Sequence, residues 1–141
     1  MNKLSKDFMK SKEILFVGYS SRNKQYSNMV YQALSEHDFT VYPFNTKENA
    51  SYDIKVYKKL EELPVMPETA FLLLSKDNTA KAVKMLAGKG IKRILFRSAA
   101  NVDTETLKEC EAQGIETAVG CPMMVYGKGL HKFHALLAGV R

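Results

Sequence analysis

The amino-acid sequence predicts an α/β fold, a single doubly wound domain with a five-stranded parallel sheet and helices on both faces. Short, continuous apolar runs recur along the 141 residues, as they do in strands that are buried on both faces. Between most of these runs, apolar residues recur at helical spacing. A helix between two strands requires a crossover connection, and crossover connections make the strands parallel.

The first strand is expected over residues 13–17, an apolar run that ends at Gly18. A helix is expected over residues 27–36, because its apolar residues share one face and Ser27 is a suitable N-cap. Residues 39–44 are rich in β-branched and aromatic types, which predicts the second strand. Together these elements form one strand–helix–strand unit.

The rest of the chain continues the alternation. A short extended piece over residues 54–57 and a helical turn over 58–63 lead into the third strand. Asp77 or Asn78 is expected to cap the helix that follows this strand, and Asp103 to cap the next one. The later elements are strands over 70–74, 94–96 and 115–119, a helix over 79–87, a helix from Asp103 to Gly114, and a C-terminal helix through Leu130, Phe133, Leu136 and Leu137.

The composition narrows the functional classes. A hydrophobic fraction of 45% supports a packed core, and the net charge of +6 fits either a solvated basic surface or an anionic partner. No block of five basic residues and no tryptophan occurs, which argues against a nucleic-acid partner. No apolar run has membrane-spanning length, and Cys110 and Cys121 match no metal-site spacing, so we expect reduced thiols in a cytoplasmic protein.

Residues 1–12 mix charged and polar types with three scattered apolar residues, and lack the apolar block of a signal peptide. We expect them to form an N-terminal arm, either a short helix or a loose segment. The domain itself is expected over residues 13–141.

In a doubly wound sheet, ligands bind beyond the carboxyl ends of the strands, where the strand order reverses. The loop after the first strand begins at Gly18 and continues with polar and basic residues into the predicted helix. A glycine turn before a helix start offers free N–H groups and a positive dipole end, which suits a phosphate. The alternative is an exposed polar loop with an ordinary helix cap.

This loop departs from the dinucleotide fingerprint, because Ser20 and Asn23 stand where the second and third glycines would. NAD-binding folds also usually carry an acidic residue after the second strand, to accept hydrogen bonds from the ribose. Here the loop reads Asn45, Thr46, Lys47. A lysine at that position favours a phosphorylated ribose, as in coenzyme A (CoA) or NADP.

The motif Gly-x-Ser-x-x-Asn-Lys-x-Tyr-Ser-Asn at residues 18–28 resembles the small stand-alone CoA-binding proteins. These are related to the N-terminal Rossmann domain of the succinyl-CoA synthetase α subunit. Residues 41–45, 54–64 and 120–126 also resemble the family, so the likeness covers about residues 12–127. Tyr19 departs from the small residue common after the glycine, and its ring is expected to narrow the pocket or to stack on a base.

The resemblance implies a Rossmann-like domain whose loop over residues 18–28 wraps the CoA diphosphate. Ser20, Lys24 and Ser27 would be the closest phosphate contacts. Asn45 and Lys47 would lie near the adenosine ribose and its 3′-phosphate. The full set of expected cofactor-binding residues is Gly18, Tyr19, Ser20, Arg22, Lys24, Ser27, Asn28, Asn45, Lys47, Ser75, Lys76 and Cys121.

The expected function is binding of CoA or an acyl-CoA without chemistry of its own, because no catalytic or metal-binding set is evident. One alternative is an enzyme, either NADP-linked or using Cys121 as a nucleophile. Another is an interaction subunit whose degenerate nucleotide pocket serves a partner. A homo-oligomer or a ligase-type partner subunit is compatible with the sequence.

Overall fold

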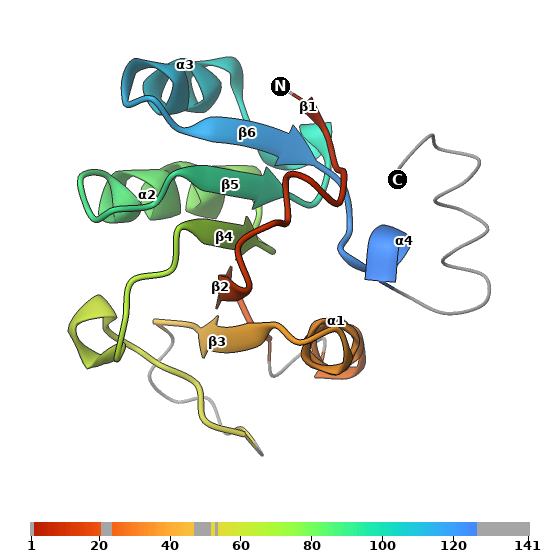
Figure 1. Cartoon of the computed structure of the whole chain (residues 1–141). Helices are drawn as coiled ribbons and strands as arrows, with labels where there is room; N and C mark the ends of the chain where they lie inside the picture. Colours follow the sequence, from red (N-terminus) through yellow and green to blue (C-terminus); the bar gives the residue numbers. More distant parts are fainter. Residues whose placement is uncertain (1, 21–23, 47–51, 53, 127–141) are drawn as a thin grey trace.

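The computed structural model of the chain describes residues 2–20, 24–46, 52 and 54–126. Within these residues it contains one sheet of six strands in the order β1-β6-β5-β4-β2-β3, and every neighbouring pair is parallel (Figure 1). This confirms the predicted parallel α/β sheet and adds one strand to it. The strands are β1 (Asn2–Lys3), β2 (Glu13–Val17), β3 (Thr40–Phe44), β4 (Thr69–Leu72), β5 (Arg93–Phe96) and β6 (Glu116–Val119).

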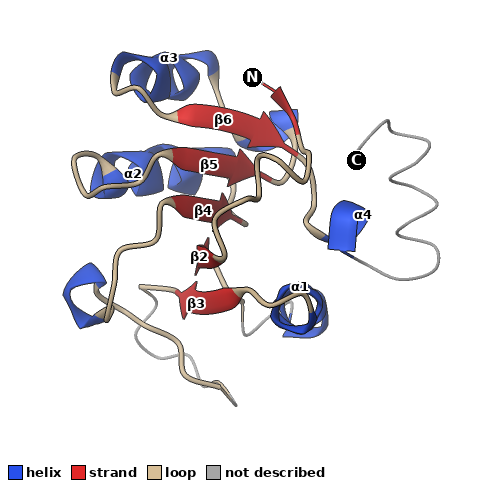
Figure 2. Cartoon of the chain, viewed as in Figure 1, coloured by secondary structure: helices blue, strands red, loops and turns tan. Residues whose placement is uncertain are grey.

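Helices cover both faces of the sheet, as a doubly wound fold requires. Figure 2 shows α1 and α4 on one side of the strands and α2 and α3 on the other. The helices are α1 (Lys24–Glu36), α2 (Lys76–Leu86), α3 (Thr104–Ala112) and α4 (Met123–Tyr126), with short 3-10 turns η1 (Leu60–Glu62) and η2 (Ala99–Asn101).

Alternate residues of each central strand supply the two cores. Phe16 of β2 packs in the cluster that includes Leu34 of α1, whereas Leu15 packs in the cluster that includes Val83 of α2. Successive side chains of a strand point to opposite faces, so a strand covered on both sides must be apolar at every position. Burying each such side chain stabilises the fold by about 1.5–3 kcal/mol relative to exposure.

The N-terminal segment joins the domain rather than forming a loose arm or an extra helix. β1 pairs with β6, and the backbone N–H of Leu4 extends this contact by donating to the carbonyl of Val119 at 3.2 Å. Leu4, Phe8 and Met9 are buried in the core on the α1 face. A two-residue strand has no apolar run of its own, so this edge pairing could not be read from local sequence.

The helix boundaries shift from those expected. α1 begins three residues before Ser27, and the N-cap of α2 is Ser75, whose Oγ accepts from the Asn78 N–H at 3.3 Å. Asp103 caps α3, as predicted. Ser75, Asp77 and Asn78 are all of residue types that can cap a helix, and the structure uses the first of them, which places Asp77 and Asn78 in the first turn of α2. The predicted C-terminal helix lies outside the described residues.

The strand order reverses beside β2, which lies between β3 and β4. The chain leaves β2 through α1 on one face to reach β3. It then crosses to β4 and continues through α2 on the other face (Figure 1). The loops after β2 and β4 therefore diverge and leave a crevice at the carboxyl edge.

Candidate functional site

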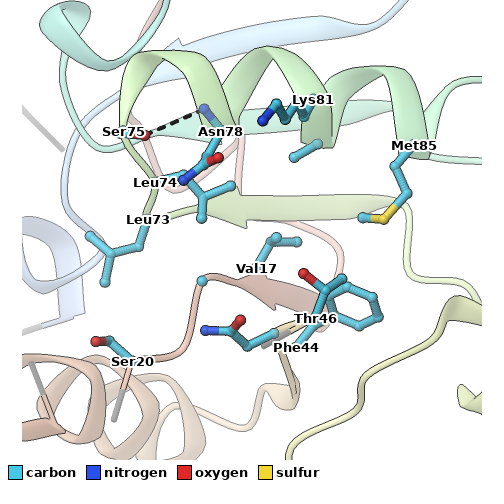
Figure 3. Close-up of a pocket in the computed structure, with 13 residues that line it drawn as sticks. Val17, Ser20, Phe44, Thr46, Leu73, Leu74, Ser75, Asn78, Lys81 and Met85 are labelled. Carbon is cyan, nitrogen blue, oxygen red and sulfur yellow. Dashed lines mark hydrogen bonds between the residues drawn. The ribbon is translucent and has the colours of Figure 1, made fainter. Parts of the chain in front are cut away.

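A pocket of about 620 Å³ opens at this reversal of strand order. Figure 3 shows its lining coming from the carboxyl ends of β2, β3 and β4 on one side and from α2 on the other. The described lining residues are Val17, Gly18, Ser20, Phe44, Asn45, Thr46, Leu73, Leu74, Ser75, Asn78, Lys81, Ala82 and Met85.

Gly18 is required at the pocket by both its conformation and its surroundings. Its φ of +92° lies in the region that L side chains rarely adopt. A Cβ placed there would lie 2.3 Å from the carbonyl oxygen of Leu73 and 2.8 Å from the Leu74 side chain. The close approach of β2 and β4 at this point therefore leaves room only for a glycine.

Side-chain hydrogen bonds to Ser27 and Asn45 help to hold the residues that follow Gly18. The Ser20 N–H donates to the Oγ of Ser27 at 3.0 Å, and Ser27 is fully buried in the first turn of α1. The Nδ2 of Asn45 donates to the carbonyl of Tyr19 at 2.9 Å. Ser27 thus contacts the backbone of Ser20 but does not line the pocket. Asn45 lines the pocket and also hydrogen-bonds to the backbone of Tyr19.

The side chain of Tyr19 lies in the core, which corrects the expectation that its ring narrows the pocket or stacks on a base. It is 1% exposed and absent from the pocket lining. Its ring makes edge-to-face contacts with Phe16, Tyr31 and Tyr52, at centroid distances of 5.4, 6.3 and 6.0 Å. An aromatic residue in a loop can be exposed or buried, and the packing around α1 decides this case.

Lys81 and Met85 of α2 line the pocket, and sequence reasoning missed both. Together with Asn78 they lie three and four residues apart, so they share one face of the helix. That spacing was visible in the sequence. Which helix face borders the crevice depends on how α2 packs on the sheet.

Lys76 does not line the pocket, contrary to the expectation for the loop after β4. Its charge contributes to the environment of Asp103, the N-cap of α3. The pKa of Asp103 is lowered mainly by hydrogen bonds from the side chain and backbone of Thr106, and to a smaller degree by the charge of Lys76. Lys76 is therefore positioned near the start of α3.

Cys121 also lies away from the lining, in a cluster at the ends of β5 and β6. Its Sγ is 2.6 Å from the hydroxyl of Tyr26, and the guanidinium of Arg97 lies 5.2 Å from the centre of the Tyr26 ring. Burial and the neighbouring Cys121 raise the pKa of Tyr26 far above its ordinary value, against a smaller opposing effect of Arg97. The phenol therefore keeps its proton and can donate it to the sulfur.

The remaining expected residues divide into two groups. Asn28 lies in α1 and is not part of the pocket lining. Arg22, Lys47 and the side chain of Lys24 lie outside the described residues. Four expected residues do line the pocket, namely Gly18, Ser20, Asn45 and Ser75.

The described residues contain no group of three or more His, Cys, Asp or Glu that could hold a metal ion. No helix among them is both long enough and apolar enough to cross a membrane.

Comparison with known proteins gives a consistent result. A family model described as a CoA binding domain matches residues 12–127. The chain is 27% identical over 135 residues to the α subunit of an ADP-forming acetate–CoA ligase from Pyrococcus furiosus, covering 92% of this chain but only 30% of the ligase subunit. A hypothetical protein from Pyrococcus horikoshii superimposes with a TM-score of 0.71 at 26% identity, over 86% of this chain and 84% of that one. A conserved hypothetical protein from Pyrococcus furiosus shares the fold at 24% identity, with a TM-score of 0.66 over 81% of this chain and 97% of that one.

Proposed function

Because this chain belongs to the CoA-binding domain family, we propose that it binds coenzyme A or an acyl-CoA in the pocket at the carboxyl edge of β2 and β4. The observation that carries this proposal is the placement of the pocket beside Gly18 and Ser20, which follow β2 and precede α1 in the chain. Helix starts of this kind bind phosphate through free N–H groups and the positive end of the helix dipole. We assign the CoA diphosphate to this loop.

The lining supports the rest of such a ligand. Val17, Phe44 and Met85 provide apolar surface for a flat base, while Asn45 and Asn78 provide amide groups that can donate and accept hydrogen bonds. The described lining includes no Cys, His, Asp or Glu, which are the usual acids, bases and nucleophiles. The proposal is therefore a binding domain without chemistry of its own. Cys121, the candidate nucleophile, lies in the separate cluster with Tyr26.

The test is calorimetric titration of the purified chain with CoA, acetyl-CoA, NADP and NAD. We expect CoA and acetyl-CoA to bind and NAD to give no heat. Ser20→Asp should weaken CoA binding at least about tenfold, because it places a carboxylate beside the diphosphate. The matched control is Ser35→Asp, at an exposed position near the other end of α1. Absence of CoA binding, or equal loss in both variants, would overturn the proposal.

A second candidate function is that of a subunit, since the chain matches 30% of the length of a ligase α subunit. In this case the CoA-loaded domain would present its ligand to a partner that supplies the chemistry. Affinity purification with and without CoA tests this idea. Recovery of a ligase-type subunit only when CoA is present would support it, and recovery of none would argue against it.

A further inference from the structure

The described lining of the pocket carries positive charge and no negative charge. Lys81 is the charged residue among the thirteen described residues that line it, and none of these is acidic. Within the described part of the chain Lys81 forms no ion pair. An anionic group entering the pocket would therefore meet an available ammonium group and no opposing carboxylate from these residues.

Lys81 is separated from the loop that we assign to the diphosphate. It comes from α2, on the same helix face as Asn78 and Met85, whereas Ser20 follows β2. Figure 3 shows Lys81 on the helix side of the pocket, across from Thr46 at the end of β3, with apolar side chains between the two sides. The described lining thus carries its cation on the α2 side of the pocket, with apolar surface between Lys81 and the carboxyl ends of the strands.

This arrangement favours a nucleotide that carries a second phosphate on its ribose. A ribose with free hydroxyls is usually recognised by a carboxylate that accepts their hydrogen bonds, and the described lining has none. A ribose phosphate instead needs a cation. Lysine provides a point charge with three N–H donors for its oxygens.

We propose that Lys81 is a specificity-determining residue that contacts the ribose phosphate of the ligand, the 3′-phosphate in CoA. This inference rests on the proposed CoA-binding function and deepens it. Lys84 provides a matched control. It is a second exposed lysine of α2, one turn from Lys81 by sequence, and it does not line the pocket.

The experiment measures the dissociation constants of CoA and 3′-dephospho-CoA for the natural chain and for the Lys81→Gln, Lys81→Arg and Lys84→Gln variants. In the natural chain, CoA should bind more tightly than dephospho-CoA. Lys81→Gln should weaken CoA about tenfold, while changing dephospho-CoA by less than about threefold. Lys81→Arg should restore most of the preference for CoA, and Lys84→Gln should retain it.

The outcomes separate this inference from the function on which it rests. Suppose that the natural chain binds CoA, but that Lys81→Gln weakens the binding of CoA and dephospho-CoA equally or leaves both unchanged. Lys81 then does not contact the 3′-phosphate, and this inference fails while the proposed function stands. Loss of the same size in Lys84→Gln would also overturn it, because the effect would then be the net charge of α2. If the natural chain binds neither CoA nor dephospho-CoA, the proposed function fails with it. Lys81 is exposed, so circular dichroism and thermal melting of the variants should match the natural chain.

Discussion

The backbone N–H of Ser20 donates a hydrogen bond to the Oγ of Ser27, with 3.0 Å between the two atoms. This bond ties the loop after β2 to the first turn of α1. Ser27 is fully buried, so its hydroxyl interacts with protein groups rather than with bulk solvent. The backbone of Ser20, beside the pocket, is therefore held by the protein itself.

Removal of this hydroxyl should weaken both the fold and ligand binding. Ser27→Ala should lower the free energy of unfolding by about 1–2 kcal/mol, because the partly buried N–H of Ser20 loses its hydrogen bond to the Ser27 hydroxyl. CoA affinity should fall as the loop becomes less ordered. Urea denaturation and calorimetry measure the two effects. The control Ser35→Ala, at an exposed position of the same helix, should change neither by a comparable amount.

Gly18→Ala should be far more damaging than alanine at another left-handed glycine. At Gly18 the added Cβ meets the Leu73 carbonyl oxygen at 2.3 Å, and the φ is unfavourable as well. Gly88 shares a positive φ of +71°, but a Cβ there has no atom within 4 Å. Gly88→Ala should cost about 1 kcal/mol, and Gly18→Ala about 3 kcal/mol or more. Equal urea midpoints for the two variants would contradict the reported close approach.

The two cysteines should differ in their reaction with a thiol reagent. Burial, chiefly, raises the pKa of Cys110 to about 11, and this side chain is fully buried, whereas Cys121 is half-buried. Since the thiolate is the reactive form, iodoacetamide at pH 8 should modify Cys121 at least about tenfold faster. Mass spectrometry of tryptic peptides measures the ratio. In denaturant the two rates should converge, and faster native labelling of Cys110 would count against the structure.

The ion pair of Glu68 should make part of the protein's stability depend on pH in the acid range. Lys92, 3.0 Å away, lowers the pKa of the Glu68 carboxyl, with a smaller effect from Arg93. Because the folded-state pKa is lower than the unfolded one, the carboxylate stabilises the fold above the unfolded pKa. This contribution is lost as the pH falls through the folded-state pKa.

The measurement is thermal unfolding from pH 7 down to pH 3 for the natural chain and for Glu68→Gln. Below the ordinary Glu pKa of about 4.5, the difference between the two melting temperatures should shrink. The control Glu61→Gln removes another exposed carboxylate, and it should show less change with pH. A constant difference for Glu68→Gln across this range would contradict the assignment.

Local patterns in the sequence determined the class of the fold and much of its layout. The apolar run over residues 13–17 coincides with β2, and Asp103 caps α3 as predicted. Gly18 has a positive φ directly after β2, where the sequence predicted a glycine turn. These features depend on periodicity, capping and backbone conformation, which act between residues close in the chain.

Only the tertiary structure decided which side chains meet. The contact between Tyr26 and Cys121 joins residues 95 positions apart, and the pairing of β1 with β6 joins residues 2–3 to residues 118–119. The direction of Tyr19 into the core and of Lys81 toward the pocket depends on how α1 and α2 pack on the sheet. Periodicity shows that a helix has distinct faces, but the packing of distant elements determines which face borders the ligand pocket.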